Sequence, residues 1–392
     1  MAASSHRHQT SLEGIIDFSE GHPIFETSKQ RAQTVDRFHR IIAHFENAEE
    51  QPASSRYGEG YNRPALVRLT FEYARSPESQ DRFLKAFFQS LAVGMLDDDD
   101  GINLNDDTEV ASLRTLLFSF SDHLIDHFFL PLRAATVKTP QPTPTYHSAV
   151  GQVQTQEDQQ RMQDLVGTPE RLAALRGFCL TRDRHRCVIT RAFDHEELTK
   201  RLRQPSAKDD DGNVLNPRDD YSHLEVAHIL PFSLTKVEAC GELNDSKKAA
   251  IAILNMVDID VIHLIEGADI DRPRNALTLS LEMHRRFGNF EIFFERVVDD
   301  DTADTYEIRA FHPFLAAVLR VPVRRTFFSH PSIDPPLERL LQLHSAIGHI
   351  LHLSGASEYI DDILRDMEDR VVREDGSTQL GAMVNVALQM RA

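Results

Sequence analysis

Apolar residues recur at helical spacing through the first third of the chain. Val35, Phe38, Ile41, Ile42 and Phe45 form one such stripe, and similar stripes run through 83–91 and 110–128. Positions three and four apart share one face of a helix, so these stripes predict amphipathic helices. We therefore predict a helical N-terminal domain over 1–137, with the stripes as its core. The alternative is that the Phe-rich faces bind a protein partner.

A polar stretch follows this helical region. Residues 138–158, KTPQPTPTYHSAVGQVQTQED, combine Pro, Thr and Gln with few apolar residues, which is typical of a linker. We predict a second domain over 159–392. Because the linker has too few apolar residues to anchor either side, a fragment beginning near Asp158 is expected to fold without the first domain.

The pattern in the second domain alternates between strand and helix. Residues 224–230 are apolar and compatible with a strand that stops at Pro231, which puts His228 near the strand end, where we expect it to be partly exposed. Residues 276–279 predict a second strand, 281–287 a two-turn helix that ends at Gly288, and 289–294 a further strand. The order is strand, long excursion, strand and short helix, with His284 in the middle of that helix.

Other segments of this domain predict further elements. A helix is expected over 169–181, with Thr168 as N-cap and Pro169 in its first turn, and others over 246–257 and 335–367. Residues 187–190, CVIT, predict a short buried strand, in which Cys187 is read as a core residue rather than a nucleophile.

Charge argues against a broad nucleic-acid surface. The chain has 43 Lys plus Arg against 61 Asp plus Glu, a formal net charge of −18. Acidic runs that end at Asp100, Asp211 and Asp301 are interpreted as solvated loops rather than calcium sites, because none has the spacing of an EF-hand loop. The segment from Arg171 to Arg203 is different, since it holds nine Lys or Arg against four Asp or Glu.

Three cysteines without a CxxC pair favour a reducing, intracellular location, nucleus or cytoplasm, and no zinc ribbon. No stretch approaches the ~20 apolar residues of a membrane span, and the first residues lack the apolar core of a secretory signal. We expect neither a membrane segment nor a membrane partner.

The sequence AHILP around His228, then Asn275, then His284 nine residues later resembles the HNH endonucleases, whose site is a ββα-metal fold. The flanks TRDRHRCVITRAFD and HLSGASEYIDDILRDMED also resemble HNH-domain proteins of filamentous fungi, and the likeness covers roughly 168–380. The resemblance implies an α+β fold class, a mainly helical chain with a small ββα-metal core.

This resemblance also implies an activity and roles for particular residues. The activity is metal-dependent hydrolysis of phosphodiester bonds in nucleic acid, with DNA as the expected substrate. His228 is the general base, Asn275 orients its loop, and His284 binds one divalent metal ion, expected to be Mg²⁺ with Mn²⁺ or Zn²⁺ as alternatives. Four arginines are candidates for phosphate binding: Arg184, Arg186, Arg285 and Arg286.

Two positions depart from the family pattern. Ala227 stands where many HNH enzymes carry a metal ligand, and Gly288 stands where an acidic residue often follows the phenylalanine. Glu225, one pleat before Ala227 on the same strand face, is our candidate for the missing ligand. We expect His228, Asn275 and His284 to converge at one open pocket. The alternatives are a catalytically silent scaffold of the same fold, or a helical protein-interaction module.

Overall fold

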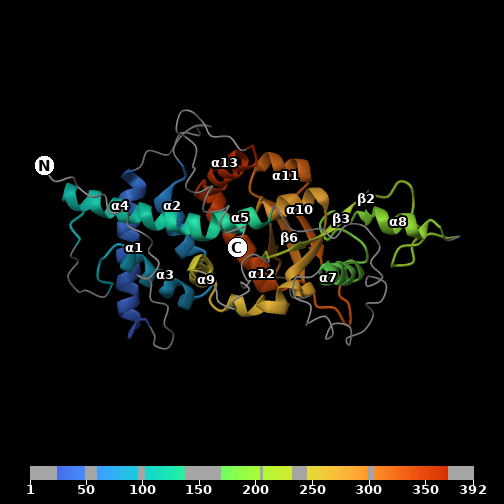
Figure 1. Cartoon of the computed structure of the whole chain (residues 1–392), viewed down its shortest axis with the longest axis horizontal. Coiled ribbons are helices and arrows are strands. Elements are labelled where there is room, and N and C mark those ends of the chain that lie inside the picture. The colour runs from blue at the N-terminus through green and yellow to red at the C-terminus, as the bar shows by residue number, and fades with distance from the viewer. Residues whose placement is uncertain are drawn as a thin grey trace. The chain divides into compact units, whose positions relative to one another are not determined.

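The computed structural model describes residues 24–48, 60–95, 102–136, 169–203, 206–231, 245–298 and 304–369 (Figure 1). The predicted linker, 138–158, lies outside these residues. The chain splits into two compact units. The first draws on Met1–Pro131, Val237–Val261 and His349–Ala392, and the second on Leu132–Lys236 and Ile262–Gly348.

The first unit is helical. Its elements are α1 (Ser28–Ala48), α2 (Arg63–Glu72), α3 (Pro77–Ser90), α4 (Asp107–Leu124), the π-helix η1 (Ile125–Phe129), α9 (Asp245–Val257) and α13 (Ala356–Asp369). Residues of the predicted stripes are buried, among them Phe38, Phe83, Leu117 and Phe128. The helices predicted from these stripes are therefore confirmed.

The first unit includes two segments that the sequence assigned to the second domain. Helix α9 packs against α2 and α3, with Ile253 and Leu254 fully buried. Backbone bonds join Arg75 N to Val257 O, 2.7 Å, and Asn62 N to Ser354 O, 2.9 Å. The contact-based units thus differ from the predicted boundary, because the helical insertion and the C-terminal helix complete the core of the N-terminal helices. A fragment beginning near Asp158 would leave these apolar faces without their partners.

The second unit holds the remaining elements. They are α7 (Pro169–Arg182), β1 (Phe193–Asp194), α8 (His195–Arg201), β2 (Tyr221–Ser222), β3 (Leu224–His228), η6 (Gly267–Asp271), η7 (Pro273–Asn275), β4 (Ala276–Ser280), α10 (Leu281–Gly288), β5 (Ile292–Arg296), β6 (Thr305–Ala310), α11 (Pro313–Leu319) and β7 (Val323–Thr326). Three elements cross the division between the units: helix α5 (Leu130–Thr136), the short 3-10 helix η5 (Val261–Leu264) and the long helix α12 (Glu338–Leu353). Strands β5, β6 and β7 form an antiparallel sheet in that order.

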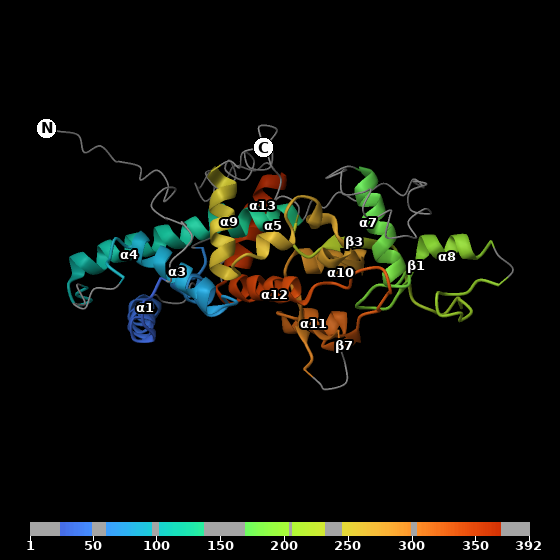
Figure 2. The same cartoon turned by 90° about the horizontal axis from the view of Figure 1, so that it is seen from below.

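A two-stranded ribbon carries the motif residues. Strand β3 pairs antiparallel with β4, and its register places His228 opposite Ala276 and Glu225 opposite Leu279. Helix α10 follows β4 directly, and both α10 and α7 contact the ribbon, which lies between them in both views (Figures 1 and 2). Together β3, β4 and α10 make the predicted ββα arrangement, so the α+β fold class with a small ββα core is confirmed.

The stretch CVIT is not a strand, contrary to the sequence-based prediction. Cys187 N donates to Ala192 O and Arg191 N donates to Cys187 O, at 3.0 and 2.9 Å, so the backbone closes a turn on itself. Val188 N donates to Thr278 O at 2.9 Å and attaches this turn to β4. Cys187 is buried, as its interpretation as a core residue requires. Apolar character alone did not distinguish a buried turn from a buried strand.

Candidate functional site

His228 is held by a buried carboxylate. Its Nε2 atom lies 3.0 Å from Oδ1 of Asp271, at the end of η6, and the other carboxylate oxygen lies 3.0 Å from Nε of Arg171 on α7. The side chains of His228 and Asp271 are 5% and 1% exposed. The expectation of a partly exposed imidazole was therefore wrong, because η6 and α7 cover the end of β3.

This contact determines the tautomer of the imidazole. An ionised carboxylate only accepts hydrogen bonds. In the neutral imidazole of His228, Nε2 is therefore the protonated nitrogen, and its N–H donates a hydrogen bond to Asp271. The lone pair is then on Nδ1, which has no protein hydrogen-bond partner among the described residues. Asp271 thus orients His228 so that Nδ1 can accept a proton.

Asn275 fastens the two loops that flank His228. Its Oδ1 accepts from Leu230 N at 3.0 Å, and its Nδ2 donates to Leu230 O at 3.0 Å and Ile270 O at 2.9 Å. The residue is completely buried. Buried amides are retained where all their donors and acceptors are paired, as here. Asn275 therefore joins the segment after β3 to η6, which carries Asp271.

A fully buried arginine reinforces the same region. Arg182 pairs with Asp183, both 0% exposed, and its guanidinium donates to Pro273 O at 2.7 Å and Ala276 O at 2.9 Å. These two carbonyls bracket Asn275. The guanidinium offers five donors in a fixed planar geometry, whereas a lysine ammonium offers three rotatable donors. Arg182 thus fixes the backbone of η7 against α7.

Glu225 and His284 form a second pair, on the α10 side of the ribbon. Nδ1 of His284 lies 2.6 Å from Oε2 of Glu225, and the two side chains are 12% and 23% exposed. A carboxylate oxygen and an imidazole nitrogen are both ligands for divalent cations. In the described part of the chain no group of three or more His, Cys, Asp or Glu could hold a metal. The pair therefore fits a cation that keeps several waters, not an all-protein cage.

The two pairs share no hydrogen bond or ion pair among the described residues. Glu225 and His228 are three positions apart on β3, and successive side chains of a strand point to opposite faces. Their partners agree with this rule, since Glu225 meets α10 whereas His228 meets η6. The structure brings His228 next to the loops held by Asn275. Convergence of His284 on the same pocket stays a prediction.

Helix α10 is held from behind by a buried histidine. The ring of His344 stacks on Phe287 and Phe290, with centroids 3.8 and 4.4 Å away, and its Nε2 donates to Phe287 O at 3.0 Å. Burial lowers the pKa of His344 to about 3, so this imidazole is neutral near neutral pH.

At Gly288, an added Cβ would lie 3.5 Å from the Cβ of Thr136. The end of α5 (Leu130–Thr136) therefore lies where the family pattern places an acidic side chain.

The structure therefore contains three features of the predicted motif. His228 ends a strand of the ribbon, Asn275 is buried between the loops, and His284 lies on the following helix. Residues 187–295 match the HNH endonuclease family model, HNH_2. No curated protein and no solved structure matches the chain. No helix in the described residues is long and apolar enough to cross a membrane.

The HNH segment contains both pairs of polar residues, but two supports lie before it. Asp271 is inside the matched range, whereas Arg171 and Arg182 come from α7. Neither Asp271 nor Arg171 was predicted from the sequence as a site residue. One feature of the sequence could have indicated Asp271. It lies four positions before Asn275 and close to Ala276, the residue that pairs with His228 in the ribbon.

The four arginines proposed for phosphate binding have different environments. Arg285 is exposed on α10 next to His284 in sequence. Arg286 is already paired with Glu282 at 2.7 Å and Glu291 at 2.6 Å. Arg184 and Arg186 are also ion-paired, with Asp211 and Asp209. Of the four candidates, Arg285 on α10 is thus the one whose side chain has no ion pair among the described residues.

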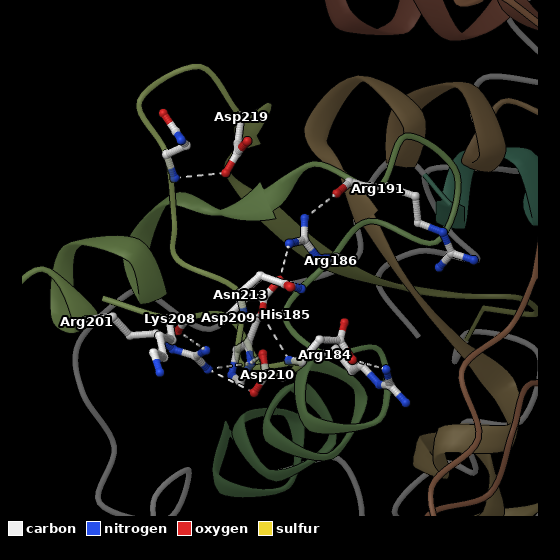
Figure 3. A network of polar contacts seen from close by, with 12 residues as sticks. Arg184, His185, Arg186, Arg191, Arg201, Lys208, Asp209, Asp210, Asn213 and Asp219 are labelled. Atoms are coloured by element: carbon white, nitrogen blue, oxygen red, sulfur yellow. Dashed lines mark hydrogen bonds and ion pairs between the residues drawn. The ribbon is translucent and has the colours of Figure 1, made fainter. Parts of the chain in front are cut away.

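The acidic run that ends at Asp211 is more than a solvated loop. Asp209 accepts from Arg186 at 2.9 Å, and Asp210 accepts from Arg201 at 2.9 Å and lies 3.0 Å from Nδ1 of His185 (Figure 3). Burial raises the pKa of Asp210, but the hydrogen bonds with His185 and Arg201 outweigh this effect and lower the pKa to about 2. The run thus pairs with three of the nine basic residues between Arg171 and Arg203: Arg184, Arg186 and Arg201.

Proposed function

We propose that the HNH segment is a metal-dependent endonuclease site that hydrolyses phosphodiester bonds in nucleic acid, with DNA as the expected substrate. The observation that carries this proposal is the buried pair of Asp271 and His228, which leaves Nδ1 as the only lone-pair nitrogen of the ring. A carboxylate that holds an imidazole in one tautomer is a recurring arrangement for general bases.

In the proposed mechanism, Nδ1 of His228 accepts a proton from a water molecule as its oxygen attacks phosphorus. The bond from phosphorus to the leaving oxygen breaks as the new bond forms. Nε2 of the ring keeps its proton and stays hydrogen-bonded to Asp271, whose carboxylate stabilises the imidazolium while Arg171 balances the carboxylate. Asn275 and Arg182 keep this group rigid through their bonds to the loop carbonyls. Arg285, which is exposed on α10 beside His284, would bind a phosphate oxygen of the substrate.

Glu225 and His284 would hold the divalent cation. When bound, it supplies positive charge to the transition state and to the leaving oxygen. Mg²⁺ suits the site best, because it commonly uses one or two protein carboxylates and keeps several waters, whereas the imidazole also accommodates Mn²⁺ or Zn²⁺. His228 is the last residue of β3, and its side chain points to the face opposite Glu225. The scissile phosphate would therefore have to lie across the strand end to contact both pairs.

A silent scaffold is the second candidate, and a specific observation favours it. Within the part of the chain that the structure describes, two candidate donors remain, since Ala227 and Gly288 lack ligating side chains and Thr136 packs against Gly288. A protein of this kind would keep the ββα fold and the ion pairs around His228 as structural elements.

Plasmid nicking by the purified full chain across Mg²⁺, Mn²⁺, Zn²⁺ and a chelator tests the proposed activity. We expect nicking with at least one divalent cation, none with the chelator, and a loss in Glu225→Gln. The matched control is Glu295→Gln, an exposed glutamate on β5 that pairs with Arg309. Absence of nicking with every cation, with melting curves showing folded protein, would favour the scaffold.

A further inference from the structure

An aromatic ring outside the HNH motif lies between two arginines. The guanidinium carbon of Arg184 is 4.7 Å from the ring centroid of Phe328, and that of Arg191 is 4.4 Å away. A third arginine adjoins them, because Arg325 Nε donates to Ile189 O at 2.6 Å. We call Arg184, Arg191, Arg325 and Phe328 the arginine cluster. It joins residues far apart in the sequence, so the sequence predicted phosphate binding for Arg184 alone among them.

The charges of this cluster are incompletely balanced. The Nη1 atom of Arg191 is buried and has no hydrogen-bond partner among the described residues, while Nη2 donates to Thr326 O at 2.5 Å. Burial lowers the pKa of Arg191, and the neighbouring charge of Arg325 lowers it further. Like charges held this close cost free energy unless an anion offsets them.

The backbone of the segment is also strained. Arg184 and Arg191 have φ of 55° and 66°, and His185 between them has φ of 52°. Non-glycine residues adopt this left-handed conformation rarely, and it persists where the surroundings impose it. The guanidiniums of two of these residues, Arg184 and Arg191, lie against Phe328.

The cluster lies beside the candidate nuclease site. Val188 N donates to Thr278 O of β4, so the turn that carries Arg191 is fixed to the outer edge of the ribbon. The other edge partner of β4 is β3, which carries His228. A strand of nucleic acid bound at the ribbon could therefore pass over the arginine cluster.

A carboxylate already pairs with one cation of the cluster. Arg184 pairs with Asp211, and their side chains are 40% and 37% exposed. Asp211 ends the acidic run. The other two aspartates of this run, Asp209 and Asp210, form ion pairs with Arg186 and Arg201 (Figure 3). An exposed ion pair contributes little to stability, so a phosphate can replace Asp211 at small cost.

We propose that the arginine cluster binds the phosphate backbone of a nucleic-acid strand and that Asp211 competes with that backbone for Arg184. This inference rests on the proposed function for the class of ligand, and it adds a binding surface to the site. Arginine suits the role because its guanidinium pairs with phosphate in two-bonded geometry and stacks on planar rings. Competition by Asp211 would weaken binding without altering the catalytic residues.

Fluorescence anisotropy of a labelled oligonucleotide, measured with the full chain and chelator present, tests the proposal without cleavage. We expect Arg184→Gln to weaken binding about three- to ten-fold and to flatten the salt dependence, because one phosphate contact is lost. Asp211→Asn should tighten binding by a similar factor. The matched control, Arg309→Gln, removes an exposed, carboxylate-paired arginine of β6 and should leave binding unchanged.

The proposal is overturned if wild-type protein does not bind at low salt, or if Arg184→Gln and Arg309→Gln have the same effect. A tighter complex in Asp211→Asn together with a weaker one in Arg184→Gln supports it. Binding with this pattern but without nicking would reject the proposed function alone. Nicking with unchanged binding in Arg184→Gln would reject the arginine cluster alone.

Discussion

The imidazole of His228 donates to the carboxylate of Asp271 across 3.0 Å, in an environment where the side chains are 5% and 1% exposed. Arg171 lies on the far side of the carboxylate. A buried charge needs such a partner, because an isolated ionised carboxylate is costly in a low dielectric. The relationship ties the strand end to η6 and α7, and it connects folding with the proposed chemistry.

Replacing Asp271 with asparagine keeps the shape but removes the negative charge. We expect the cleavage rate to fall about 10²-fold or more, since the amide can favour the wrong tautomer of His228 and cannot stabilise the imidazolium. Asp269→Asn is the control, because Asp269 lies on the same short helix but pairs with Arg272 and Arg274. Equal rates in the two variants would contradict a role for Asp271 in orienting the base.

Replacing Asn275 with alanine should destabilise the second unit. The change removes three hydrogen bonds and leaves buried backbone groups of Leu230 and Ile270 unsatisfied, which costs about 3 kcal/mol. Asn255→Ala, which removes one exposed bond to Asp260 N, should cost under about 1 kcal/mol. Urea denaturation measures both values, and a loss in Asn275→Ala as small as that of the control would contradict the structural role.

Binding of Mn²⁺, followed by the free-ion signal in electron paramagnetic resonance, tests the metal ligands without any cleavage. Glu225→Gln and His284→Ala should each weaken binding about ten-fold or more, because each removes one of two protein donors. Glu295→Gln should bind as the parent does. If all three variants bind Mn²⁺ equally, the cation is held elsewhere.

The pH dependence of stability should report on His344. Burial lowers its pKa to about 3 in the fold, whereas a histidine in the unfolded chain has its ordinary pKa of about 6.5. Between these values the unfolded chain binds the extra proton, so stability falls as pH decreases below 6.5, by up to about 1.4 kcal/mol per pH unit. Above pH 6.5 both states are neutral and the effect vanishes. His344→Phe should show a smaller loss over this range, and an identical pH profile would contradict the prediction.

Local patterns in the sequence predicted much of the HNH core. Strand β3, strand β4 and helix α10 appear within a residue or two of their expected bounds, because alternation, Pro231 and Gly288 are local signals. Glu225 and His284 also lie within hydrogen-bonding distance of each other, while their role as metal ligands stays a prediction. These features depend on spacing that a single segment can carry.

Long-range contacts account for what the sequence did not predict. Asp271 acquires its role only when η6 meets the end of β3, and Phe328 meets Arg184 only in the fold. Helix α9 was predicted, but its association with α3 depends on apolar faces that many partners could cover. Hydrophobic burial has no direction, so a stripe indicates that a face is covered and not by which element.

Single-turnover cleavage of a labelled duplex by the parent and His228→Ala, with binding measured in parallel, tests the central claim most directly. Melting curves establish that the variant is folded, since the imidazole is buried. We predict that His228→Ala cleaves at least about 10²-fold more slowly while its affinity for the duplex stays within about two-fold. Cleavage by the folded variant at the parental rate would contradict the assignment of His228 as the base and with it the proposed site.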